Sequence, residues 1–248
     1  MSQRLRQFAA ATGLLTRLPI WRLVADAPVD FAASVWAFPV VGGIVGALGG
    51  LVYLLCWGIG LPPAMAGIWT VAAMLLMTGA LHEDGLADTA DGLGGGASVE
   101  RKLAIMRDSR IGSYGALALG LALATRGVAI TEIARPADVA AALIVSGAVS
   151  RATIIVVLLA SRPARTDGMA AGLSQLPPAE TCAGVAIAAL LALLLVPSVS
   201  FLILAGITFG VGVGAALLAK AQIGGHTGDI LGACAIVAEC AVLTLLAR

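Results

Sequence analysis

Apolar stretches of about 20 residues alternate with short polar segments along this chain. Because an α-helix rises about 1.5 Å per residue, such stretches are long enough to cross the apolar core of a bilayer. The pattern predicts an all-α, polytopic integral membrane bundle with about seven transmembrane helices, at residues 33–59, 63–81, 112–133, 137–160, 181–196, 199–219 and 230–247. Residues 1–248 are expected to form a single membrane-embedded domain.

Composition supports this class. Hydrophobic residues make up 60% of the chain, charged residues only 12%, and the mean hydropathy is +1.01, as expected of a protein whose solvent is largely lipid. The net charge of +1 gives no basic surface, which excludes nucleic acid as a partner. The 31 glycines would permit close helix contacts, within one chain or in a homo-oligomer.

The basic residues predict an orientation. With the N-terminus in the cytoplasm, eleven of the fifteen lysines and arginines fall on the cytoplasmic side, only Arg135 and Arg248 fall outside, and Arg126 and Arg151 lie within spans. This is the asymmetry of the positive-inside rule. Residues 1–30 lack a continuous apolar core and are expected to form an amphipathic segment on the cytoplasmic surface. The predicted location is therefore the cell inner (cytoplasmic) membrane, with the polar motifs on its cytoplasmic side.

The most polar segment is residues 82–111, which begins with four carboxylates in nine residues: Glu83, Asp84, Asp88 and Asp91. The last three, spaced four and then three apart, share one face of a helix, where they would repel one another. A hard divalent cation would relieve that repulsion, and Mg²⁺ suits a water-accessible site with carboxylates and substrate phosphates. The alternative is a solvated acidic cap at a helix end.

A basic stretch follows the acidic one, and consists of Arg107, Asp108, Ser109 and Arg110. The planar guanidinium fork of arginine matches the oxygens of a phosphate group. Together with the carboxylates, this stretch predicts a site for a metal-bound pyrophosphate. The alternative is that these arginines fix the topology and contact anionic lipid head groups.

A second motif lies at residues 220–229, where Gly224-Gly-His-Thr-Gly-Asp229 leads into the last predicted helix. Glycines let the backbone approach a ligand closely, and a helix N-terminus favours an anion such as phosphate. His226, Thr227 and Asp229 are therefore candidate substrate-binding residues, and Asp229 could complete a metal shell or accept a substrate hydroxyl. The alternative is a glycine-rich turn in which Thr227 or Asp229 caps the helix.

Glu239 lies roughly 15 Å deeper than Asp229 along the last helix. An ionisable group at that depth costs about 2.5–3.5 kcal/mol on insertion and normally needs a partner. Arg151 and Arg126 are the available cations. The sequence leaves open whether Glu239 and Arg151 form a structural pair or contact substrate in a polar cavity.

At these residues the chain resembles the cobalamin synthases, or adenosylcobinamide-GDP ribazoletransferases. The resemblance rests on five stretches that span nearly the whole chain: Thr16-Arg17-Leu18-Pro19, Phe38-Pro39-Val40-Val41-Gly42, His82-Glu-Asp-Gly-Leu-Ala-Asp-Thr-Ala-Asp-Gly92, Met106-Arg-Asp-Ser-Arg-Ile-Gly112 and Gly224-Gly-His-Thr-Gly-Asp229. The stretch at 82–92 is the most specific of them. The resemblance implies the last step of the cobalamin nucleotide-loop pathway, with adenosylcobinamide-GDP and α-ribazole, or α-ribazole 5′-phosphate, as substrates, GMP as a product and Mg²⁺ as cofactor.

The residue chemistry fits that reaction. Asp84, Asp88 and Asp91, with Glu83 as a further candidate, would hold the metal, while the ribose 5′-hydroxyl attacks the β-phosphorus. Arg107 and Arg110 would neutralise charge on the pyrophosphate, and Asp91 or His82 would serve as general base.

Two other functions remain open at this point. A CDP-alcohol-type membrane phosphotransferase also places aspartates on membrane helices, although its Ala-Arg pair after the first Asp-Gly is replaced here by Leu-Gly-Gly after Gly92. A transporter or channel would use Arg126, Arg151 and Glu239 as a polar path through the membrane.

Overall fold

The computed structural model describes residues 2–20, 30–165, 172–173 and 175–248. The helices are α1 (Gln3–Leu15), the short 3₁₀ helix η2 (Ala32–Ala37), α2 (Phe38–Gly58), α3 (Pro63–Thr78), α4 (Leu81–Gly95), α5 (Val99–Ile105), α6 (Ser113–Ile133), α7 (Pro136–Ala160), α8 (Pro178–Leu195), α9 (Ser198–Ile223) and α10 (Gly228–Leu246). Within these ranges there is no β-strand, and the one isolated β-bridge joins Pro163 to His226. The all-α prediction is confirmed.

The long helices are those of a multi-pass membrane protein. Six described segments are long and apolar enough to cross a bilayer, namely 32–58, α6, α7, α8, α10 and nearly all of α9. The predicted span at 63–81 ends early: α3 stops at Thr78, and α4, which starts at Leu81, leaves it at an angle of 89°. Counting this bent pair as one span gives the predicted seven.

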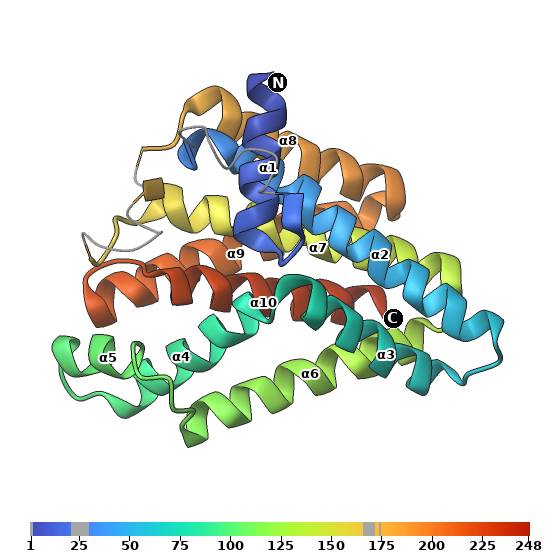
Figure 1. The fold of residues 1–248 in the computed structure, drawn as a ribbon, viewed down its shortest axis with the longest axis horizontal. Helices are drawn as coiled ribbons and strands as arrows, with labels where there is room; N and C mark the ends of the chain where they lie inside the picture. Colours follow the sequence, from blue (N-terminus) through green and yellow to red (C-terminus); the bar gives the residue numbers. More distant parts are fainter. Residues whose placement is uncertain (1, 21–29, 166–171, 174) are drawn as a thin grey trace.

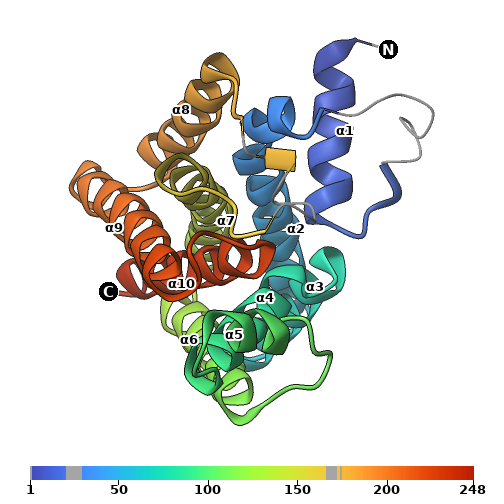
Figure 2. The same cartoon turned by 90° about the vertical axis from the view of Figure 1, so that its left-hand side faces the viewer.

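Helix α7 is the centre of the bundle. It is largely buried, whereas α6, α8 and α9 are mostly exposed, and Figure 2 shows it surrounded by α2, α8, α9 and α10. Its closest neighbour is α2. Glycines make that approach possible, because a Cβ on Gly147 would overlap the carbonyl oxygen of Gly42, and a Cβ on Gly46 would overlap that of Leu143. Such backbone contact between small residues is how helices in membranes pack tightly.

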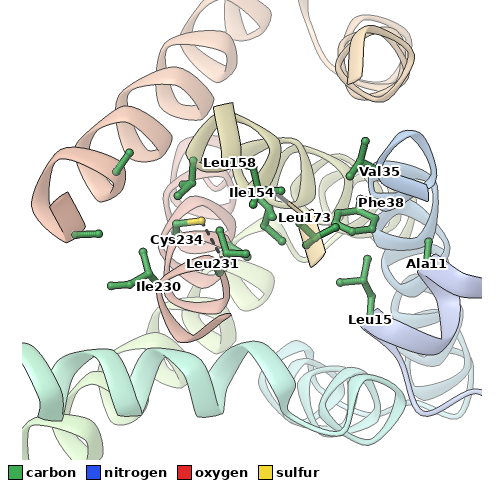
Figure 3. Packing of buried hydrophobic residues seen from close by; sticks show 14 of the residues in the cluster. Ala11, Leu15, Val35, Phe38, Ile154, Leu158, Leu173, Ile230, Leu231 and Cys234 are labelled. Atoms are coloured by element: carbon green, nitrogen blue, oxygen red, sulfur yellow. Dashed lines mark hydrogen bonds between the residues drawn. The ribbon is translucent and has the colours of Figure 1, made fainter. Parts of the chain in front are cut away.

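Helix α1 lies across the side of the bundle, roughly perpendicular to the long helices (Figures 1 and 2). It buries Ala9, Ala10, Ala11, Thr12 and Leu15. Figure 3 shows Ala11 and Leu15 near Phe38, in the cluster of buried residues that also includes Leu231. Of the predicted N-terminal segment 1–30, residue 1 and residues 21–29 lie outside the described part of the chain.

The bend between α3 and α4 has a local cause. Gly79 and Ala80 both adopt the left-handed conformation, with φ of 64° and 54°. Two consecutive left-handed residues cannot continue a right-handed helix, so the chain turns and a new helix starts at Leu81. The acidic motif is therefore helical, and its direction is set by this break.

Helix α4 packs against α10 through small residues. A Cβ on Gly85 would be 2.8 Å from the carbonyl oxygen of Asp229, and a Cβ on Gly232 would be 3.2 Å from the Cα of His82. The acidic motif and the second glycine-rich motif, far apart in sequence, are thus side by side (Figure 1).

We expect Gly147→Ala to destabilise the protein by about 1–3 kcal/mol, because the new methyl group would have to push α2 away from α7. Gly120→Ala in α6 is the matched control, since a Cβ there meets no atom within 4 Å. Thermal unfolding in detergent measures both. Equal melting temperatures for the two variants would contradict the close α2–α7 contact.

Candidate functional site

A cavity of about 1000 Å³ opens between α1, the α3–α4 break, α4 and the loop that precedes α6. Its lining is mixed, with acidic side chains from α4 and basic side chains from the N-terminal segment and the loop. The polar and charged lining residues are Thr16, Arg17, Thr78, Glu83, Asp84, Asp88, Arg107, Asp108 and Ser109. The cavity is at the upper end of the 300–1000 Å³ usual for small-molecule sites, which suits a large substrate.

Three of the four predicted metal ligands, Glu83, Asp84 and Asp88, line this cavity. Asp84 and Asp88 lie one helical turn apart on α4, with Asp84 exposed and Asp88 half-buried. Asp84 also lines a second cavity, of about 140 Å³, together with His82 and Asp229. The structure therefore brings Asp229 to the acidic motif, as its predicted role in completing a metal shell requires.

These carboxylates repel one another. The charges of Asp84, Asp229 and Asp91 all act on Asp88. Within the described ranges, no group of three or more histidine, cysteine, aspartate or glutamate side chains is close enough to hold a metal ion jointly. The pair Asp84–Asp88 nevertheless fits Mg²⁺, which commonly takes one or two protein carboxylates and completes its shell with water and phosphate oxygens.

Asp91 lies one turn beyond Asp88 on the same face of α4, but it does not line the large cavity. Its carboxylate is buried and accepts hydrogen bonds from the backbone N–H groups of Gly112, at 2.7 Å, and Gly115, at 2.9 Å. Those N–H groups belong to the start of α6, where a carboxylate also interacts favourably with the helix dipole. Asp91 thus joins α4 to α6, and its predicted roles as metal ligand and base are not tested by this arrangement.

Glu83 belongs to a buried ionic network. Its Oε1 accepts from Arg126 Nη1 at 2.7 Å, and the same nitrogen lies 3.4 Å from Glu239 Oε1. Glu239 Oε2 pairs with Arg151 Nη1 at 3.1 Å. The network contains two acids and two bases from four helices, α4, α6, α7 and α10. Glu239 and Arg151 therefore form a buried ion pair, and neither residue lines the large cavity.

The basic stretch divides between cavity and solvent. Arg107, Asp108 and Ser109 line the large cavity, whereas Arg110 is not among its lining residues. The side chain of Arg110 is exposed and pairs with Asp108 at 2.6 Å. Hydrogen bonds from Arg110 lower the pKa of Asp108 to about 2. The structure thus places Arg107 and Ser109 where they could contact a substrate phosphate, and engages Arg110 with its neighbour.

The second motif is fixed by the segment after α7. His226 donates its backbone N–H to the Arg162 carbonyl at 2.9 Å and accepts from Ala164 at 2.8 Å. Its Nδ1 lies 2.8 Å from the Ser161 hydroxyl, and burial lowers the pKa of the imidazole. These contacts hold the turn at His226 against the segment that follows α7.

Thr227 and Asp229 form the start of α10. Thr227 is the N-cap, because its hydroxyl oxygen accepts from the backbone N–H of Ile230. The same hydroxyl donates to Asp229 Oδ2 at 3.1 Å, and Arg165 lies 3.6 Å from that oxygen. The capping alternative therefore holds for Thr227, while Asp229 faces the acidic motif.

Two cationic residues near the site were missing from the predicted set. Arg17 lines the large cavity, and Arg165 pairs with Asp229. Arg17 stood in one of the stretches on which the family resemblance rests, which was a usable signal. Nothing in the local sequence placed Arg165 beside Asp229, because that contact joins residues far apart in the chain.

Comparisons with known proteins bear on this site. A family model described as cobalamin-5-phosphate synthase matches residues 7–247. A Bradyrhizobium diazoefficiens protein named adenosylcobinamide-GDP ribazoletransferase is 42% identical over 96% of this chain and 91% of its own length. Proteins of that name from Mesorhizobium japonicum (40% identical, 97% and 92% covered) and Shewanella pealeana (42%, 93% and 90%) are similarly close. No solved structure matches this chain.

We expect Glu239→Gln to destabilise the bundle by about 3–5 kcal/mol, because it leaves two buried arginines with reduced compensation. Asp138→Asn is the control, since the Arg135–Asp138 pair is largely exposed and such pairs contribute little. Unfolding in detergent measures both. Equal melting temperatures for Glu239→Gln and Asp138→Asn would contradict a structural role for Glu239.

Proposed function

We propose, on the premise that this chain belongs to the cobalamin-5-phosphate synthase family, that its adenosylcobinamide-GDP ribazoletransferase chemistry takes place in the large cavity beside α4. The protein is a transferase of cobalamin biosynthesis that acts at its final step. Its substrates are adenosylcobinamide-GDP and α-ribazole, as the name of the relatives implies. The single observation that supports the location is that Asp84, Asp88, Arg107 and Ser109 line one cavity.

Asp84 and Asp88 would hold Mg²⁺. When bound, the ion would neutralise negative charge on the phosphate oxygens of the donor and polarise the phosphorus. The two carboxylates suit this task because they lie on one face of a helix at the cavity wall and repel each other without a cation. Glu83 is less suited to it, since its Oε1 is already bonded to Arg126.

The remaining groups would position the two substrates. Arg107 and Ser109 would donate hydrogen bonds to the diphosphate as charge develops on the leaving GMP. Asp229 would accept the proton of the attacking ribose hydroxyl, since it lies near Asp84 and lines the adjoining small cavity with His82. Asp91 is less suited to be the base, because both of its oxygens accept backbone hydrogen bonds.

We assign this site to the cytoplasmic side of the membrane. The loop at 106–112, the segment at 161–165 and the turn at 224–227 lie at one end of the bundle, away from the C-terminus (Figure 1). That end includes Arg101, Lys102, Arg107, Arg110 and Arg162, as the positive-inside rule requires. The substrates and Mg²⁺ would then meet the enzyme from the cytoplasm.

We expect Asp88→Asn to lower the rate of GMP release by on the order of 100-fold or more, because it removes one of two carboxylates that hold the metal. The melting temperature should be unchanged or higher, since the substitution also removes a repelled charge. The measurement is GMP release by the purified protein from adenosylcobinamide-GDP and α-ribazole.

Glu132→Gln provides the matched control for charge loss. Glu132 is an exposed carboxylate at the far end of α6, and its substitution should leave turnover at the wild-type level. Near-normal turnover of Asp88→Asn would refute the assignment of that residue to the metal.

Removal of the metal ion tests the same proposed site without a substitution. In excess EDTA we expect no GMP release, because only the divalent cation can neutralise the donor phosphates beside the negatively charged carboxylate pair. Mg²⁺ added back should restore release. Release should also require the acceptor. Release that continues in EDTA would show that the reaction does not depend on a divalent cation.

A further inference from the structure

We propose that Arg17 is a further substrate-binding residue and that its guanidinium binds a substrate phosphate where α3 breaks to α4. The inference rests on the proposed function, because it concerns the same cavity. Arg17 lines that cavity together with Gly79, Ala80, Arg107 and Ser109. The phosphate is either part of the donor diphosphate or the 5′-phosphate of a phosphorylated acceptor.

The position of Arg17 is fixed by its backbone. The N–H of Arg17 donates to the carbonyl oxygen of Met77 at 2.8 Å, which joins the N-terminal segment to the last turn of α3. The preceding residue is also held, because the Thr16 hydroxyl donates to the Thr12 carbonyl at 2.7 Å and accepts from the Leu18 N–H at 3.2 Å. The side chain therefore starts from an ordered site at the cavity wall.

Gly79 determines where that side chain goes. A Cβ on Gly79 would overlap the Nε of Arg17 and lie 2.7 Å from its Cγ, so the arginine stem lies directly against the bare backbone of the break. The same glycine adopts a left-handed φ of 64°. One residue thus allows both the turn into α4 and the approach of Arg17 to it.

Within the described part of the chain, the charge of Arg17 is not paired with a carboxylate. Among the described residues no ion pair within 4.0 Å includes Arg17, although Asp84 and Asp88 line the same cavity. By contrast, Arg126, Arg151 and Arg165 each pair with an acid. An arginine fork and a carboxylate pair that line the same cavity complement a metal-bound phosphate, which presents oxygens to both.

The beginning of α4 strengthens the attraction for an anion there. Its N-cap is Ala80, and no side chain caps the first N–H groups. The positive end of the helix dipole is therefore beside Arg17 at the break. A purely structural alternative exists, because Arg17 also lies near the last turn of α3, where a cation is favourable.

The experiment compares Arg17→Gln and Arg17→Lys with Arg6→Gln, an exposed charge on α1 that does not line the cavity. KM is measured for adenosylcobinamide-GDP, for α-ribazole and for α-ribazole 5′-phosphate, from GMP release at saturating Mg²⁺. We expect Arg17→Gln to raise one phosphate-dependent KM by about 10- to 100-fold, since a charge-assisted hydrogen bond is lost. Arg17→Lys should give a smaller rise and keeps the test usable if the glutamine variant is unstable. Arg6→Gln should match wild type.

The pattern of KM values identifies the phosphate. A rise for adenosylcobinamide-GDP with either acceptor assigns Arg17 to the donor diphosphate. A rise for α-ribazole 5′-phosphate alone assigns it to the acceptor phosphate.

Unchanged KM values would overturn the inference, whether the melting temperature falls, as a structural role at α3 predicts, or stays the same. Failure of the proposed function is distinct, because in that case the wild-type protein itself would release no GMP.

Discussion

The buried network of Glu83, Arg126, Glu239 and Arg151 determines how the site is built. In a bundle with so few charges, each of these groups must find its counter-charge inside the protein, because lipid offers none. Glu83 precedes Asp84 on α4, so the pair that it forms with Arg126 fixes the rotation of α4 about its own axis. With Glu83 turned toward the interior, Asp84 and Asp88 face the cavity. The ion pair between Glu83 and Arg126 in the core thereby orients Asp84 and Asp88, the carboxylates proposed to hold the metal.

The break between α3 and α4 supplies the second constraint. A continuous helix would have extended the apolar span, whereas two left-handed residues redirect the chain and start a new helix beside α10. The glycines at 85 and 232 then allow α4 and α10 to touch. As a result, Asp229 stands beside Asp84, although the sequence separates them by most of the chain.

The fold could be predicted largely from the sequence, since helix length and apolar composition determine membrane spans directly. The predicted spans 112–133 and 137–160 correspond closely to α6 and α7. The sequence could not show that the 63–81 span stops at Thr78, because its composition stays apolar through Ala80 and Leu81. For the site, residue type and spacing identified the acidic motif. They could not show which groups Glu83, Asp88 and Asp91 meet, because those groups lie on or beside α6 and α10.

The order in which the chain is synthesised gives the network a further consequence. Arg126 and Arg151 enter the membrane well before Glu239, which follows them by 113 and 88 residues. Until the final helix arrives, Arg151 lacks the carboxylate that neutralises it in the finished protein. The central helix α7 therefore cannot reach its mature environment during the early stages of insertion, and the last helix completes the assembly. A chain that ends before α10 would retain an uncompensated charge on Arg151 in its central helix.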